Sequence, residues 1–208
     1  MTCAQFAVLL PVKPPARGKS RLVGASDERR RELAAAFALD TVAACLAADR
    51  VAEVLAVTDD AVFSRRLAGL GCASIPDGVA GDLNGALWQA AAEVHRRWPD
   101  LVPAAVCADL PALLPEELAT ALAGAADAKA SFVADAAGEG TTMYTAPYDV
   151  FAPRFGPGSR LAHLDAGAVE IAGVLSTLRL DVDDLADLRA AVALGVGPHT
   201  ARVELQTQ

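Results

Sequence analysis

The sequence has few aromatic residues, little positive charge and no long apolar run. Aromatic residues make up 5% of its 208 residues, which is too few for the stacking platforms that bind single-stranded nucleic acids. Acidic residues outnumber basic ones, and the net charge of −8 argues against a nucleic acid or an anionic membrane as the main partner. We therefore expect a protein that acts on small molecules, without nucleic acid or membrane partners.

The four cysteines lack the close spacing that metal sites and redox pairs use. Zinc sites and redox pairs need spacings such as CxxC, and none occurs here. No apolar run reaches the ~18 residues of a membrane-spanning helix, and the segment Met1 to Val12 lacks the basic region of a signal peptide. Reduced thiols and the absence of these signals predict a cytoplasmic protein.

What is present is an alternation of short apolar runs with longer helical stretches. This alternation is typical of an α/β fold with a mostly parallel sheet and helices on both faces. No linker or repeat interrupts it, so we expect one domain spanning residues 1–208. The expected strands are 6–12, 52–58, 72–75, 103–108, 131–133, 141–145 and 178–182, and the expected helices are 26–48, 61–70, 83–98, one from Pro115, and 184–194. Ligands of such folds bind where the strands end.

The first strand ends in a basic loop. Lys13, Lys19 and Arg21 lie in it with Arg17, so four cations fall within nine residues. Lysine and arginine bind phosphates, so the loop predicts a triphosphate site; the alternative is a solvated basic loop that only affects solubility. The loop is no P-loop, because Lys13 stands where that motif needs glycine.

Carboxylates follow two later strands. Asp109 comes directly after the run 103–108, and Asp181-Val182-Asp183 ends the run 178–182. Asp109 with one of the latter pair could hold Mg²⁺, which prefers one or two carboxylates together with substrate phosphates. We expect Asp181 and Asp183 to point to opposite faces. The alternative is that Asp183 or Asp184 only caps the following helix.

Weaker signals for ligand binding occur at a helix start and in two glycine-rich segments. Asn84 begins a helix, where it could contact a nucleobase or only cap a turn. The segments 138–142 and 155–160 are rich in glycine and hydroxyl residues, which indicates a second anion site or ordinary turns. His163 lies near this second segment and is interpreted as a surface residue.

Taken together, these segments form an ordered set: Val12-Lys13 with Lys19-Ser20-Arg21-Leu22, Asp109-Leu110-Pro111, Gly140-Thr141, Phe155-Gly156-Pro157-x-Ser159 and Asp181-Val182-Asp183. The set, from Val8 to about Gly197, resembles the guanylyltransferases of coenzyme F420 biosynthesis, which act on phosphoenolpyruvate or 2-phospho-L-lactate. The resemblance implies a Rossmann-like nucleotidyltransferase fold of the GT-A type with its core at about 6–197. Departures from the family pattern are Ala108 in place of glycine, Asp184-Leu185 in place of Thr-Pro, and Pro14-Pro15 in the basic loop.

The resemblance also implies roles for individual residues. The residues expected at the GTP phosphates, where they would act in catalysis, are Lys13, Lys19 and Arg21. The residues expected to hold Mg²⁺ are Asp109, Asp181 and Asp183, and Asp109 would also lie by the nucleotide. Those expected at the phosphorylated acceptor are Thr141, Gly156 and Ser159, and Asn84 would lie by the nucleoside.

The implied reaction joins GMP from GTP to phosphoenolpyruvate or 2-phospho-L-lactate and releases pyrophosphate. It fits the absence of a visible nucleophile–histidine pair, because a phosphate monoester is already an anionic nucleophile at neutral pH. The alternatives are a sugar-phosphate or molybdopterin type of nucleotidyltransferase, and a nucleotide-binding module without turnover. A homodimer is possible, but the sequence does not determine the oligomeric state.

Overall fold

A computed structural model describes residues 4–12, 26–78, 81–125 and 129–205, and its centre is a seven-stranded sheet in the order β3-β2-β1-β4-β6-β5-β7. The strands are β1 (Phe6–Pro11), β2 (Val51–Val57), β3 (Ala73–Ile75), β4 (Val102–Val106), β5 (Ser131–Ala134), β6 (Thr141–Thr145) and β7 (Val169–Glu170). Neighbouring strands are parallel except at β6, which is antiparallel to both β4 and β5. The expectation of a mostly parallel sheet is confirmed.

The central strand β1 is buried on both faces, which explains its continuous apolar sequence. Val8 and Leu10 face one hydrophobic cluster, and Ala7 and Leu9 face the other. This two-residue alternation divides the core into two layers, one on each face of the sheet.

Helices cover both faces. One face carries α1 (Asp27–Ala47), α2 (Ala61–Ala68), α4 (Pro115–Ala125) and α6 (Ser176–Arg179). The other carries α3 (Leu83–Arg97), the 3-10 turn η2 (Tyr148–Val150) and α5 (Ser159–Asp165). Within the described ranges, no helix has the length and apolar content needed to cross a membrane.

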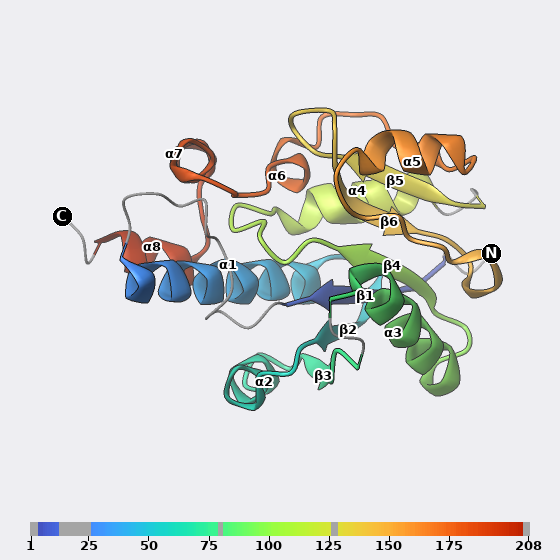
Figure 1. The fold of residues 1–208 in the computed structure, drawn as a ribbon, viewed down its shortest axis with the longest axis horizontal. Helices are drawn as coiled ribbons and strands as arrows, with labels where there is room; N and C mark the ends of the chain where they lie inside the picture. Colours follow the sequence, from blue (N-terminus) through green and yellow to red (C-terminus); the bar gives the residue numbers. More distant parts are fainter. Residues whose placement is uncertain (1–3, 13–25, 79–80, 126–128, 206–208) are drawn as a thin grey trace.

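The last two helices, α7 (Leu185–Leu194) and α8 (Pro198–Leu205), extend the fold beyond the sheet. Figure 1 shows α8 alongside α1. Leu33 and Phe37 of α1 form a third cluster with Leu188 of α7, and Val182 is buried in the same cluster. The third cluster therefore connects the C-terminal helices to the segment that carries Asp181 and Asp183.

One strand prediction is wrong. Residues 178–182 do not form a strand: α6 ends at Arg179, and the chain then runs without regular structure to α7. Leu178 and Val182 are both fully buried, and a short apolar run with this i, i+4 spacing does not distinguish a helical turn from a strand. The sheet edge is formed instead by β7, which pairs with β5 and was not predicted.

Asp40 in α1 is buried and holds the start of α8. Its two carboxylate oxygens accept the backbone N–H groups of His199 and Thr200, at 3.0 and 2.8 Å. A carboxylate suits a helix N-terminus because it satisfies N–H groups that lack partners within the helix. Gly197 fits against this carboxylate because a Cβ there would meet it.

We predict that Asp40→Ala lowers the free energy of unfolding by about 3 kcal/mol, because one buried and one half-buried N–H group lose a charged acceptor. Asp40→Asn keeps one acceptor oxygen, so about half of that loss is expected. Urea unfolding measures both, with the exposed Asp49→Ala as control, for which a change under about 0.5 kcal/mol is expected. Equal stability of the Asp40 and Asp49 variants would contradict this role.

Candidate active site

The candidate site lies at the edge of the sheet where β4 and β5 end and β6 begins. Asp109 follows β4, and Asp135 directly follows β5. Because β6 is antiparallel to both neighbours, its first residue, Thr141, lies at this same edge, paired with Ala134. The sheet thus brings residues far apart in the sequence to one place, as expected for α/β folds.

The loop that carries Asp109 is fixed by α1. The buried hydroxyl of Thr41 accepts the backbone N–H of Leu110 at 3.1 Å. It also lies 3.3 Å from the carbonyl oxygen of Ala108 and 2.8 Å from that of Phe37. Both neighbours of Asp109 are therefore held by one side chain, which sets the position of the carboxylate between them.

Asp181 and Asp183 are positioned by the residue between them. Val182 is fully buried in the third cluster, and its N–H donates to the carbonyl oxygen of Asp109 at 3.0 Å. The expectation that the two carboxylates point to opposite faces is wrong. Residues two apart in a strand share a face, and this segment is not a strand. The carboxylates of Asp181 and Asp183 both lie close to that of Asp109.

Asp184, rather than Asp183, caps the helix that follows. Its carboxylate accepts the N–H groups of Ala186 and Asp187 at 2.7 and 3.0 Å, and Asp187 accepts the N–H of Asp184 in return. This is a complete capping box at the start of α7. Of the two capping candidates, Asp183 and Asp184, the structure confirms Asp184.

The three carboxylates form a compact cluster. Asp109, Asp181 and Asp183, all half-buried, each offer one oxygen, and these oxygens lie within 4.8 Å of one another. Burial, followed by the nearby carboxylates of Asp109 and Asp183, raises the pKa of Asp181 to about 7. Oxygen ligands at this spacing fit a hard divalent cation, whose charge would offset the repulsion. We call this group the carboxylate cluster.

Asp135 lies beside the carboxylate cluster and was not predicted as a site residue. Its charge contributes to the raised pKa of Asp181. Its two oxygens accept the N–H groups of Glu139 and Gly140, at 2.9 and 2.8 Å, and so shape the turn before β6. A signal similar to that of Asp109 was available, because Asp135 comes two residues after the expected strand 131–133.

The loop before α5 contains the glycines of the Phe-Gly-Pro-x-Ser segment. Gly156 has φ 141° and Gly158 has φ 67°, both in the region that favours glycine. Ser159 begins α5 and is buried, and its N–H donates to the carbonyl oxygen of Gly156 at 3.1 Å. Glycine is thus required here by the backbone conformation.

Asn84 connects this loop to α3. Its side-chain amide nitrogen donates to the carbonyl oxygen of Phe155 at 3.0 Å, and its amide oxygen accepts the N–H of Phe155 at 2.8 Å. Asn84 stands at the start of α3, so this pair of bonds joins α3 to the loop that contains Gly156. Both polar groups of the side chain therefore contact protein backbone.

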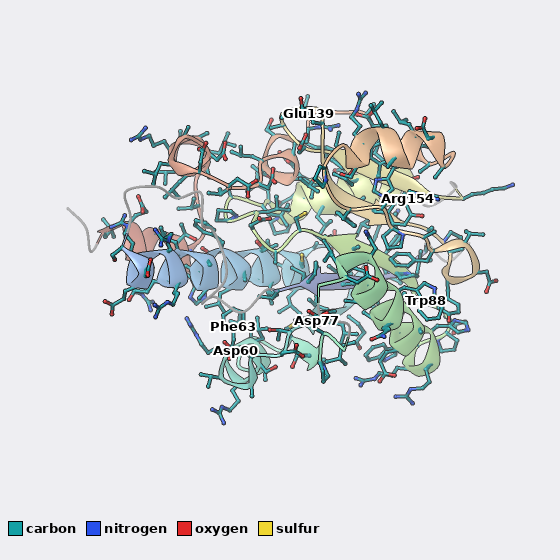
Figure 2. The ribbon with its side chains drawn as sticks, viewed as in Figure 1. Asp60, Phe63, Asp77, Trp88, Glu139 and Arg154 are labelled. Carbon is teal, nitrogen blue, oxygen red and sulfur yellow. The ribbon has the colours of Figure 1, made fainter. Side chains whose placement is uncertain are left out.

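His163 is not a surface residue, as its sequence position suggested, because it is fully buried. It stands four residues after Ser159 in α5, and this spacing puts both on one face of the helix. Arg154 belongs to the loop leading to α5 (Figure 2), and its backbone N–H donates to Nε2 of His163 at 2.9 Å. Helical spacing from Ser159 was the available signal for this residue.

The basic loop belongs to a part of the chain that the structure does not describe. Lys13, Lys19 and Arg21 lie outside the described residues, so their roles stay predictions. Val12, the last described residue before them, donates its N–H to the carbonyl oxygen of Val57 at 2.9 Å. The chain therefore leaves the sheet for this loop beside the end of β2.

Several solved structures share this fold. CMP:2-keto-3-deoxy-manno-octonic acid synthetase complexed with CTP matches with a TM-score of 0.59 and 16% identity, covering 92% of this chain and 98% of that one. The 4-diphosphocytidyl-2C-methyl-D-erythritol synthase of Anaerococcus prevotii matches with a TM-score of 0.59 and 12% identity, covering 91% and 95%. A Mycobacterium tuberculosis protein solved with manganese matches with a TM-score of 0.56 and 20% identity, covering 92% and 100%. The fold is that of a nucleotidyltransferase.

The sequence comparisons are more specific. Residues 6–202 match the family described as guanylyl transferase CofC like, and the chain belongs to this family. It is 50% identical to the phosphoenolpyruvate guanylyltransferase of Streptomyces coelicolor over 202 residues, which covers 96% of this chain and 95% of that protein. It is also 50% identical to the phosphoenolpyruvate guanylyltransferase of Thermomonospora curvata, covering 94% and 87%.

The raised pKa of Asp181 predicts a pH-dependent stability of the metal-free protein. A carboxyl group whose pKa rises from 3.8 to about 7 on folding stabilises the fold at low pH, and this contribution is lost as the pH rises between those two values. Asp181→Asn carries no such charge. We expect the variant to gain about 2 kcal/mol over the wild type between pH 4 and pH 8.

Urea unfolding in the presence of a chelator, over this pH range, measures the difference. Asp184→Asn is the matched control, because it removes a neighbouring charge while asparagine caps a helix as well as aspartate does. A constant difference between Asp181→Asn and wild type from pH 4 to pH 8 would show that Asp181 does not titrate in this range.

Proposed function

We propose that this chain is a phosphoenolpyruvate guanylyltransferase. It transfers GMP from GTP to the phosphate of phosphoenolpyruvate, releases pyrophosphate and forms enolpyruvoyl-2-diphospho-5'-guanosine, a compound of coenzyme F420 biosynthesis. The observation that carries this proposal is the 50% identity, over nearly the whole of both chains, to the Streptomyces coelicolor protein of that name.

The carboxylate cluster supports a metal-dependent transfer. Asp109, Asp181 and Asp183 would hold Mg²⁺, which suits carboxylate ligands completed by substrate phosphates. Bound there, the ion would neutralise negative charge at the α-phosphate of GTP. The manganese in the Mycobacterium tuberculosis structure of the same fold is consistent with a divalent ion in this role.

The remaining groups would hold the two anionic substrates. Lys13, Lys19 and Arg21 would bind the triphosphate, which arginine can do with paired hydrogen bonds. Thr141, Gly156 and Ser159 would bind the acceptor from the β6 side of the sheet edge. Asn84 would act next to the nucleoside through the loop that it fixes, because its amide groups already bond to Phe155.

The chemistry requires positioning more than acid–base catalysis. The acceptor's phosphate has a second pKa near ~6, so at neutral pH its oxygen is already an anionic nucleophile. A bond forms between this oxygen and the α-phosphorus of GTP, and the bond from the α-phosphorus to the bridging oxygen breaks, so that pyrophosphate leaves with the electron pair. The protein has to hold two repelling anions in line, which electrostatics and orientation achieve.

The test is pyrophosphate release from GTP and Mg²⁺ with phosphoenolpyruvate, 2-phospho-L-lactate or 3-phosphoglycerate, with the product mass recorded. Release with phosphoenolpyruvate, and a product of one GMP joined to it, is expected. Asp109→Asn should reduce this turnover at least about 100-fold, because it removes a charged ligand from the site of the reacting phosphate.

Asp184→Asn is again the control, since this residue lies next to the carboxylate cluster but outside it. Turnover near the wild-type value is expected for it. Turnover with a sugar phosphate and with none of the three acids would overturn the proposed acceptor. Wild-type turnover in Asp109→Asn would overturn the proposed metal role.

A further inference from the structure

His163 is enclosed by aromatic rings on the α5 face of the sheet. Its ring stacks on Phe132 and on Tyr144, with centroid distances of 5.3 and 4.7 Å, and Phe155 contacts it edge-on at 5.8 Å. Burial lowers the pKa of His163 to about 4, although the carbonyl oxygen of Ser159 opposes this change. The imidazole is therefore neutral at physiological pH and fixed in one orientation.

The hydrogen bonds of the ring determine which nitrogen carries its proton. A backbone N–H can only donate, so Nε2, which receives the N–H of Arg154 at 2.9 Å, has no proton. A neutral imidazole has one proton, so it must be on Nδ1. Nδ1 lies 3.0 Å from the hydroxyl oxygen of Thr141. Nδ1 is thus a donor, and its proton is shared between the Thr141 hydroxyl oxygen and the backbone carbonyl oxygen of Ser159.

This assignment leaves the hydroxyl proton of Thr141 available. The proton cannot go to Nδ1, which is itself a donor, and within the described residues no other hydrogen bond of this hydroxyl is found. Thr141 lies at the sheet edge, paired with Ala134, and the carbonyl oxygen of the next residue accepts the N–H of Cys107. Thr141 therefore lies at the same edge of the sheet as Asp135, which follows Ala134, and as Cys107, which follows β4.

We propose that His163 is a positioning residue that makes the Thr141 hydroxyl a hydrogen-bond donor to an anionic oxygen of the phosphorylated acceptor. A hydroxyl can donate or accept, and its rotation is otherwise unrestricted. By occupying a lone pair of the oxygen, the Nδ1 proton commits the hydroxyl to donation. It also draws electron density from that oxygen, which strengthens the donated bond. This inference rests on the proposed function.

The same histidine fixes a second part of the acceptor region. Its Nε2 accepts the backbone N–H of Arg154, and Asn84 bonds to the backbone of the next residue, Phe155. The loop that leads to Gly156 is thereby tied to the hydroxyl of Thr141 through one imidazole ring. His163 would thus set the distance between two of the three groups proposed to bind the acceptor.

The tautomer is tested without any reaction. In protein labelled with ¹⁵N-histidine, long-range ¹H–¹⁵N spectra at pH 7 should show His163 with a protonated Nδ1 and an unprotonated Nε2. The spectrum of His163→Asn identifies the signals of this residue. A proton on Nε2, or a doubly protonated ring, would overturn the proposal whether or not the protein is a guanylyltransferase.

Kinetics test the effect on the acceptor. His163→Asn keeps an amide donor near the Nδ1 position, whereas His163→Gln keeps an acceptor near the Nε2 position and loses that donor. We expect Thr141→Val to raise the KM for phosphoenolpyruvate about tenfold to a hundredfold, in line with a lost bond to a charged group. His163→Gln should raise it about tenfold, His163→Asn less than threefold, and none should change the KM for GTP by more than about twofold.

The double variant separates positioning from a structural role. If His163 acts through Thr141, then Thr141→Val with His163→Gln should have the acceptor KM of Thr141→Val alone, because the hydroxyl is already absent. Effects that multiply, or equal rises in the KM of both substrates, would overturn the proposal. If the wild type uses no phosphorylated acid at all, the proposed function fails, and the spectra still decide the tautomer.

Discussion

The structure depends on holding three carboxylates close together against their mutual repulsion. The oxygens of Asp109, Asp181 and Asp183 lie within 4.8 Å of one another, and the protein achieves this with backbone and apolar contacts. Thr41 fixes the loop around Asp109, and the buried Val182 fixes the other two. The free energy of packing therefore offsets an electrostatic cost that a divalent cation would relieve.

The C-terminal helices contribute to the site through this arrangement. The segment that carries Asp181 and Asp183 has no regular structure, so its position depends on what lies on either side. On one side, Arg179 donates from its guanidinium to the carbonyl oxygens of Ala134 and Ile171, both at 2.9 Å. On the other, α7 is capped by Asp184, and α8 is held on α1 by Asp40. Contacts far from the carboxylate cluster thus set its geometry.

The proposed acceptor region is built in a different way. It combines a buried imidazole, two hydroxyls and a glycine-containing loop with the charge of Arg154, which acts on His163. Hydrogen-bond donors with a nearby cation suit an anionic ligand beside a negatively charged cluster. The side-chain amide of Asn84 fixes the loop of this region by linking α3 to Phe155.

The order of strands and helices could be predicted from the sequence because buried parallel strands are continuous apolar runs, as in Phe6–Pro11, and helix starts have recognisable caps, as at Ser26. The run from Leu178 to Val182 misled because burial alone does not define the conformation of five residues. The resemblance to known guanylyltransferases named Asp109, Asp181 and Asp183 together, and the structure brings one oxygen of each within 4.8 Å of the others.

The burial of His163 could not be predicted from the sequence. A histidine with no nearby catalytic partner in sequence is usually exposed, and only the tertiary structure encloses this one between Phe132 and Tyr144. Asp135 could have been found, because it follows a strand as Asp109 does. The difference is that strand ends are local features, whereas a stacked ring requires elements from different parts of the chain.

The most direct test of the account is to locate the metal. A crystal of this protein grown with Mn²⁺ and GTP should show an anomalous-scattering peak within coordination distance of carboxylate oxygens of Asp109, Asp181 and Asp183, next to the α-phosphate. A peak at the phosphates alone, with the three carboxylates unliganded, would contradict the claim that the fold is organised around a metal-binding carboxylate cluster.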